Sequence, residues 1–175
     1  MFQMKIQPFL KLIILFLSAG IFLVSCNTIG DEQTVQPLEY RNLNTQKKVL
    51  ILAKGSEFKA KVIEATVQRL RWGYSITLDD LDNIEEYNFM LYSVVVLMES
   101  CRDNQFKRIR NYLSGYSGVN NIVVFGTHAE RPMDSPEASL SELNGVAAVT
   151  CASRLVSANE AAASLVKSIR AKGKE

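Results

Sequence analysis

Short, continuously apolar runs alternate along this chain with longer segments in which apolar residues recur at helical spacing. A run of four or five apolar residues between polar neighbours is typical of a strand covered on both faces. Strands that alternate with helices form βα units, which build a parallel sheet. The predicted strands are Val49–Ala53, Ser75–Leu78, Tyr92–Met98, Asn121–Phe125 and Val146–Thr150, and the predicted helices are Glu57–Arg71, Asn104–Leu113, Ser139–Leu143 and Ala158–Lys172.

The predicted helix Glu57–Arg71 is amphipathic, so one stripe should pack on the sheet while the opposite face meets water. Gly73 ends it. The segment Asp79–Glu86 is expected to be an acidic connection. On the helix, the expected packing residues are Phe58, Val62, Ala65, Thr66 and Leu70, and the expected exposed residues are Lys59, Lys61, Glu64, Gln68 and Arg71.

The first 26 residues have the pattern of an export signal. Lys5 and Lys11 provide positive charge, and Leu12–Val24 is apolar but shorter than the ~20 residues that a helix needs to cross a bilayer. The sequence Leu23-Val24-Ser25-Cys26 resembles the lipobox of bacterial lipoproteins. This resemblance implies that residues 1–25 are removed and that Cys26 carries fatty acyl chains such as palmitate. The alternative is an uncleaved membrane anchor with an incidental cysteine.

If the resemblance holds, the mature chain is tethered to a membrane by its lipid and does not span it, since two or more acyl chains give stable anchoring. The expected location is the bacterial cell envelope, on the extracytoplasmic side of a membrane. Residues 26–46 are polar and without helical or strand periodicity, which predicts a flexible tether. Residues 47–175 are enough for one domain of ordinary size.

The charge balance argues against a nucleic-acid partner. Of the 20 lysines and arginines, Lys5 and Lys11 leave with the signal, so 18 remain to balance 18 aspartates and glutamates. The mature chain is therefore formally neutral, whereas nucleic-acid-binding domains usually carry a basic excess or stripe. The partners expected instead are the membrane, through Cys26, and another envelope protein.

The order of predicted elements resembles the flavodoxin-like family. The resemblance rests on Lys-Val-Leu-Ile-Leu at residues 48–52, Tyr-Ser-Val-Val-Val-Leu at residues 92–97 and Ile-Val-Val-Phe-Gly-Thr at residues 122–127. It implies a doubly wound α/β domain with five parallel strands in the order 2-1-3-4-5 and helices on both faces. In such a sheet, ligands bind beyond the carboxyl ends of the strands.

The loop after the first strand only partly fits an FMN phosphate. Flavodoxins place a loop rich in hydroxyl groups there, and Gly55 and Ser56 alone match it. Glu57 is expected to satisfy the helix N-terminus itself and to repel a phosphate. The other candidate ligand-binding residues at this edge are Ser100, Gly126 and Thr127.

Flavodoxins also sandwich the flavin between aromatic residues in the loops after the third and fourth strands. The corresponding segments here, 99–104 and 127–136, contain no aromatic residue, and Phe106 is expected to be a core residue of its helix. FMN is therefore a candidate cofactor only in a modified binding mode.

Cys101 and Cys151 follow the third and fifth predicted strands, so both should lie at the ligand-binding edge. With one strand between theirs, they are separated by about 9 to 10 Å, beyond the usual disulfide range of under ~7 Å between Cα atoms. They are either a strained, reversible redox pair or two small, partly buried side chains.

Other chemistry has less support in the sequence. His128 is the only histidine and lies in the fourth-strand loop, where it is either an acid or base or simply solvated. No metal site is expected, because Asp79, Asp80 and Asp82 lack the glycine and terminal glutamate of a calcium loop. The acid pair and third-strand aspartate of a phosphoacceptor receiver domain are also missing, since Ala53-Lys54 and Met98-Glu99-Ser100 occupy those positions.

The sequence therefore predicts a lipid-anchored envelope protein whose domain acts as a binding or accessory module. One alternative is an FMN-binding electron carrier or flavin-dependent reductase. A second alternative is a thiol-disulfide redox protein that uses Cys101 and Cys151. The sequence leaves open whether the protein is an enzyme.

Overall fold

A computed structural model describes residues 34–100, 106–115, 120–128 and 145–174. The predicted signal peptide, Cys26 and the beginning of the predicted tether lie outside this part of the chain. The described residues form one six-stranded sheet in the order β1-β3-β2-β4-β5-β6. The strands are β1 (Leu38–Tyr40), β2 (Lys48–Ala53), β3 (Ser75–Asp80), β4 (Val94–Ser100), β5 (Ile122–His128) and β6 (Val146–Ala152).

Strands β2 to β6 are mutually parallel and correspond to the five predicted strands. Strand β1 pairs antiparallel with β3 and adds an edge that the five-strand prediction lacked, so the strand count and the full order differ from it. This strand falls within residues 26–46, so the expectation of a continuous flexible tether is wrong for Leu38–Tyr40. All three residues of β1 are exposed, which explains why no pattern of apolar burial revealed the strand.

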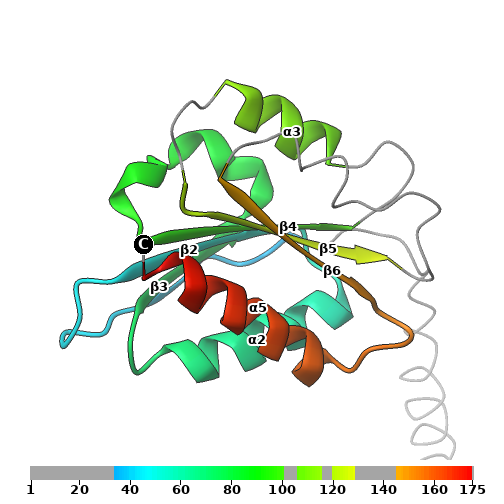
Figure 1. The fold of residues 1–175 in the computed structure, drawn as a ribbon, viewed down its shortest axis with the longest axis horizontal. Coiled ribbons are helices and arrows are strands. Elements are labelled where there is room, and N and C mark those ends of the chain that lie inside the picture. Colours follow the sequence, from blue (N-terminus) through cyan, green and yellow to red (C-terminus); the bar gives the residue numbers. More distant parts are fainter. Residues whose placement is uncertain (1–33, 101–105, 116–119, 129–144, 175) are drawn as a thin grey trace, which may run out of the picture. The chain divides into compact units, whose positions relative to one another are not determined.

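Helices cover both faces of the sheet (Figure 1). On one face, α2 (Glu57–Leu70) and α5 (Ala158–Lys172) pack over a core that includes Val49, Ile51 and Val96. On the other face, α3 (Lys107–Ser114) and the short 3₁₀ helices η1 (Leu81–Glu86) and η2 (Phe89–Leu91) cover Leu50 and Leu52. The result is a mixed α/β architecture with a mostly parallel sheet. No helix among the described residues has the length and hydropathy that crossing a membrane requires.

The connection between β3 and β4 is more structured than expected. Within the segment predicted as an acidic connection, Leu81–Glu86 forms η1, in which Leu81 and Ile84 are buried as packing residues. Strand β3 runs two residues further than predicted, to Asp80. The predicted short helix Ser139–Leu143 lies outside the described residues.

The carboxyl ends of the parallel strands meet at one edge of the sheet, which we call the carboxyl edge. The register places Ala53 of β2 between Asp80 of β3 and Met98 of β4. It also aligns Ser100 of β4 with Thr127 of β5, and Thr127 with Cys151 of β6. The loops expected to carry chemistry therefore begin side by side.

Candidate functional site at the carboxyl edge

Several predicted site residues do gather at the carboxyl edge. Ser100, Thr127 and Cys151 are neighbours in register across three strands. Gly55 and Ser56 follow β2 and lead directly into α2. Cys26 and Cys101 lie outside the described residues, so their chemistry stays a prediction.

Ser56 caps helix α2 through its hydroxyl oxygen. Its backbone is extended, with φ −153° and ψ 161°, and its hydroxyl oxygen accepts a hydrogen bond from the amide of Lys59 at 3.2 Å. Side-chain capping of this kind satisfies one of the free amides at a helix start. Gly55, immediately before it, is buried.

Glu57 lies in the first turn of α2, as expected, and its carboxylate pairs with Lys61. Its carboxylate accepts a hydrogen bond from Nζ of Lys61, one turn further along α2, at 2.7 Å, and 86% of its side chain is exposed. The hydrogen bond and charge of Lys61 lower the pKa of Glu57 below its ordinary value. The carboxylate is therefore turned toward solvent and Lys61. The helix cap comes from Ser56, and the predicted repulsion of a phosphate by Glu57 is correspondingly weaker.

Lys54, the residue directly after β2, forms ion pairs at the carboxyl edge. Its Nζ lies 2.8 Å from a carboxylate oxygen of Asp80, and it also contacts the carboxylate of Asp82. The side chains of Lys54 and Asp80 are only 12% and 6% exposed. Charges shielded from water interact more strongly than those at an open surface. The ammonium group of Lys54, which directly precedes Gly55 and Ser56, is thus paired with carboxylates of the chain.

Asp80 connects three segments of the chain. Besides Lys54, its Oδ2 accepts a hydrogen bond from the amide of Val35 at 2.9 Å. Its Oδ1 accepts one from the amide of Asp82 at 2.9 Å and so caps η1. The carboxylate therefore fixes the start of η1 and the segment that leads into β1, in addition to pairing with the loop after β2.

Asp79 belongs to a second hydrogen-bond cluster beside the first. It accepts from the Tyr87 hydroxyl at 2.6 Å, the amide of Asp80 at 2.7 Å and Nδ2 of Asn83 at 3.1 Å. Burial alone would raise the pKa of Asp79, but these hydrogen bonds hold it below its ordinary value. Burial and the bond to Asp79 raise the pKa of Tyr87, which therefore stays protonated as a donor.

Lys59 is buried, contrary to the expectation that it faces water. None of the residue is exposed, and its Nζ donates to the hydroxyl oxygen of Ser100 at 2.9 Å. This contact joins the first turn of α2 to the end of β4. Ser100, a predicted ligand-binding residue, therefore makes an internal contact with a buried ammonium group.

The end of β5 is also engaged in internal contacts. Gly126 and Thr127 are buried, and Thr127 is only 6% exposed. The carbonyl oxygen of His128 accepts hydrogen bonds from the amide of Ser153 at 2.8 Å and from its hydroxyl at 3.2 Å. These bonds tie the end of β5 to the loop after β6 and leave the acid-base hypothesis for His128 untested.

Cys151 is a free thiol that is 8% exposed. Burial raises its pKa from an ordinary value of 9.0 to about 11. Because the thiolate is the reactive species, such burial makes Cys151 a poor nucleophile near neutral pH. This burial is what the alternative of a small, partly buried side chain predicts for Cys151.

The sequence contained signals for the residues that the predictions missed. Strand order 2-1-3 makes the ends of the first two strands neighbours, which would have brought Lys54 next to Asp80. The buried face of α2 consists of Lys59, Val62, Ile63, Thr66, Val67 and Leu70, a regular helical spacing in which Lys59 occupies the first position. The charge of Lys59 favours an exposed position, but its spacing matches the buried stripe.

The described polar side chains of the carboxyl edge mainly bind one another. A cation that binds an anion must be accessible. Of the described cations at this edge, Lys54 is paired with Asp80 and Asp82, and Lys59 is buried. Among the residues that the structure describes, no cluster of three or more metal-ligating side chains is found. In comparisons with known proteins, no family model matches the chain and no curated protein gives a significant match.

Proposed function

We propose that the chain is a bacterial lipoprotein, anchored through acylated Cys26 on the extracytoplasmic side of a membrane. Its domain has a flavodoxin-like fold and acts as a binding or accessory module of the cell envelope. The order β3-β2-β4-β5-β6 of the parallel strands supports this fold, because it corresponds to 2-1-3-4-5 when β1 is left aside. The lipobox-like sequence at residues 23–26 supports the anchor.

One observation favours a binding module over an FMN carrier: the Lys54 ammonium is held by Asp80 and Asp82 beside the loop where a flavin phosphate would bind. A phosphate there would have to compete with two carboxylates for this cation. Ion pairing within the chain thus takes the place of the contacts that an anionic cofactor needs.

The anchor is tested by expressing the full chain in a bacterium fed a clickable fatty acid. The chain should fractionate with membranes, carry the label and lose residues 1–25. The variant Cys26→Ala should lose the acyl label and retain its signal, whereas Cys101→Ala, as the matched control, should keep the label. Acylation that persists in Cys26→Ala would contradict the proposed anchor.

The module is distinguished from a flavin carrier by the visible absorbance of the chain purified from these membranes in mild detergent. We expect no flavin absorbance, and none after overnight incubation with FMN followed by gel filtration. A stoichiometric flavin that survives gel filtration would instead assign the protein to the flavin-dependent alternative. This result is independent of the acylation test.

A further inference from the structure

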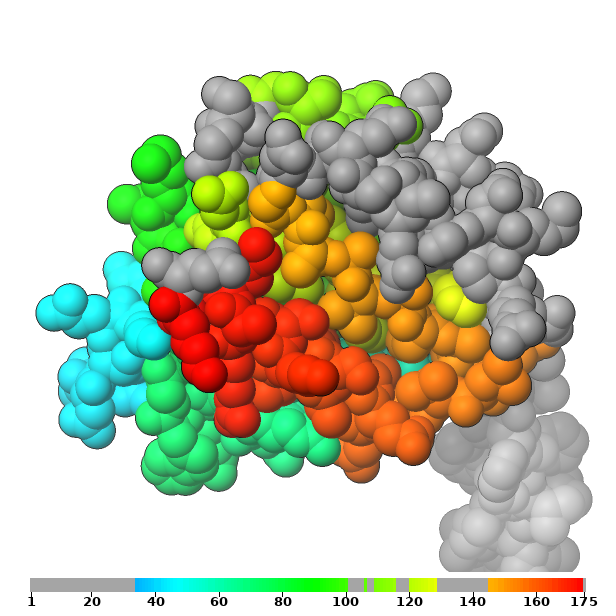
Figure 2. All heavy atoms as spheres, in the orientation of Figure 1, coloured from blue at the N-terminus to red at the C-terminus, as the bar shows by residue number. Residues whose placement is uncertain are grey.

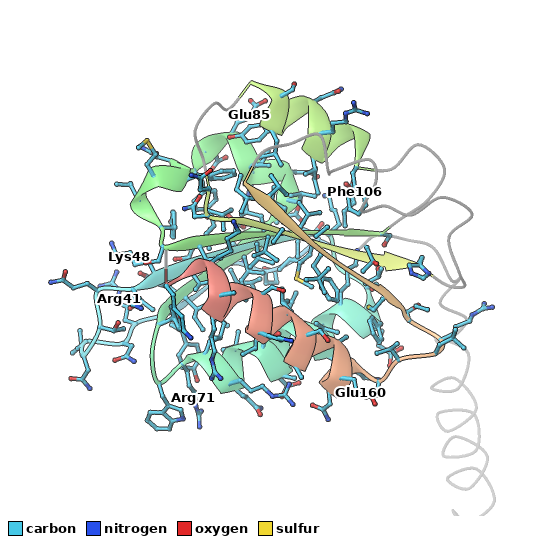
Figure 3. The ribbon with its side chains drawn as sticks, in the orientation of Figure 1. Arg41, Lys48, Arg71, Glu85, Phe106 and Glu160 are labelled. Carbon is cyan, nitrogen blue, oxygen red and sulfur yellow. The ribbon has the colours of Figure 1, made fainter. Side chains whose placement is uncertain are left out.

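A groove lies at the amino edge of the sheet, opposite the carboxyl edge. It has a volume of about 470 Å³ and borders the edge strand β1. Figure 3 shows Arg41 and Lys48 at this end of the sheet, and both line the groove. The lining residues that the argument uses are Glu39, Arg41, Leu43, Lys48, Leu91 and Tyr92.

Apolar side chains are unusually exposed around this groove and β1. Leu43 is 95% exposed, Leu91 66%, Leu38 50% and Tyr40 41%. In Figure 2 the light-blue atoms of the chain around β1 and the turn after it are uncovered. Neighbouring exposed apolar residues with a polar border are typical of a surface that contacts another molecule.

Among the residues that the structure describes, no strand pairs with the outer side of β1. The amide of Ser75 donates to the carbonyl oxygen of Lys47, so Ser75 faces β2. Backbone groups alternate in direction along a strand, so Ile76 and its partner Tyr40 face each other across the β1–β3 pair. The amide and carbonyl of Glu39, between Leu38 and Tyr40, therefore point away from the sheet, at its open edge.

We propose that β1 docks a second copy of this chain by antiparallel pairing with the same strand. A twofold axis at Tyr40 would place Glu39 of each copy opposite Arg41 of the other. It would also make one continuous sheet from two copies. The proposal goes beyond the proposed function and does not depend on it.

The charge pattern of β1 matches itself in this register. Within one copy, Nε of Arg41 lies 3.0 Å from a carboxylate oxygen of Glu39, and both side chains are mainly exposed, at 75% and 54%. The twofold axis brings two pairs of opposite charge together across the strands, where opposite charges stabilise pairing and like charges oppose it. On the other side of the new sheet, Tyr40 of each copy would meet Tyr40 of the other.

The flanking residues are also compatible with this register. Leu43 lies in the turn just after β1 and is 95% exposed, so a second copy paired with β1 would lie close to it. The second copy would also supply an outer wall to the groove beside Arg41. Since the paired edge is short, the interface is smaller than the about 1,200 to 2,000 Å² of stable complexes. The association is therefore expected to be weak and reversible.

Edge strands are often protected from pairing by short length, charged side chains and proline. The strand β1 is short, and Pro37 and two charges lie in or next to it. These charges disfavour pairing with strands that carry mismatched charges. In antiparallel pairing about Tyr40, however, Glu39 of one copy lies opposite Arg41 of the other, so the charges are complementary. The charges of β1 therefore disfavour pairing with other strands but permit pairing with a second copy of the chain.

Cysteine cross-linking of the full chain in native membranes tests the proposal. Residue 40 would lie opposite its symmetry mate with Cα atoms about 4.5 Å apart, within the range of a disulfide. We expect Tyr40→Cys to give a disulfide-linked product of twice the chain mass on mild oxidation. Lys167→Cys, an exposed position on α5, is the control for random collisions. The unmodified chain gives the background from Cys101 and Cys151.

Charge reversal tests the register. Glu39→Arg added to Tyr40→Cys should lower the cross-linked fraction about five- to tenfold, and further addition of Arg41→Glu should restore it. Equal membrane abundance and protease resistance confirm that the variants fold.

The proposal is overturned if Tyr40→Cys cross-links no more than Lys167→Cys, or if the double charge reversal stays as low as the single one. Adducts with a different protein would overturn it too. The proposal is also overturned if the bilayer shields the Tyr40→Cys thiol and no disulfide-linked dimer forms.

Discussion

The Nζ atom of Lys54, at the end of β2, lies 2.8 Å from a carboxylate oxygen of Asp80, at the end of β3. The strand order makes these ends neighbours, and β2 and β3 are in parallel register up to Ala53 and Asp80. The pair therefore follows directly from the fold. Lys54 lies where a loop of this fold would bind an anion, and here it forms an ion pair within the chain.

Replacing Asp80 with alanine should destabilise the protein by about 2 to 4 kcal/mol. The change leaves the mostly buried Lys54 with a weaker counter-charge and removes the acceptor for the amides of Val35 and Asp82. Urea unfolding followed by circular dichroism measures the loss. Lys61→Ala breaks the exposed pair with Glu57 and serves as a matched control that should not change stability measurably. Equal effects of the two changes would show that the Lys54–Asp80 pair contributes no more than an exposed one.

The contact between Lys59 and Ser100 should show a coupling free energy of about 1 to 3 kcal/mol in a double-mutant cycle. A hydrogen bond from a buried ammonium group is stronger than one between neutral groups. The cycle uses Lys59→Met, Ser100→Ala and the double variant, each unfolded in urea. Additive effects would mean that the two side chains do not interact.

Asp79 should contribute stability that disappears in acid. Its pKa in the folded protein lies below the ordinary value of 3.8, so the folded state favours the ionised carboxylate. The contribution is fully present above about pH 4 and is lost as the pH falls through the lower folded value. The stability difference between the native chain and Asp79→Asn should therefore shrink below about pH 4.

Tyr87→Phe removes the Tyr87 hydroxyl, a main donor to Asp79, and should raise the pKa of Asp79. Carboxyl ¹³C chemical shifts followed between acidic and neutral pH give this value directly. An unchanged Asp79 titration in Tyr87→Phe would contradict the assigned cause of the shift.

Cys151 should react slowly with thiol reagents in the folded protein. A pKa of about 11 instead of 9.0 lowers its thiolate fraction near neutral pH about 100-fold, and burial restricts access further. Maleimide labelling of the Cys101→Ser variant, with Cys26 acylated, reports on Cys151. Rapid labelling without denaturant would contradict this environment and revive the thiol-disulfide alternative.

The parallel strands could be predicted from sequence because each is a run of apolar residues covered on both faces, such as Val49–Ala53. Strand β1 could not, because all of its residues are exposed and it is held by backbone pairing to β3. The hydrogen bonds between Asn42 and Ser75 hold the chain just after β1 and have no apolar pattern at all.

The placement of the candidate residues at one edge of the sheet could be predicted from the sequence, but the partners of their side chains could not. Strand ends correctly marked Gly55, Ser56, Ser100 and Thr127 as residues of one edge. Their partners depend on side-chain directions that a linear pattern does not contain. Glu57 turns along its helix to Lys61, and Lys59 turns inward to Ser100.

The most direct test of the account is a titration of the purified chain with FMN, followed by quenching of flavin fluorescence. Because Lys54 is held by Asp80 and Asp82, we predict no saturable quenching up to about 100 µM FMN. Saturable one-to-one binding that is abolished by Lys54→Met would contradict the account, because Lys54 would then be available to a phosphate.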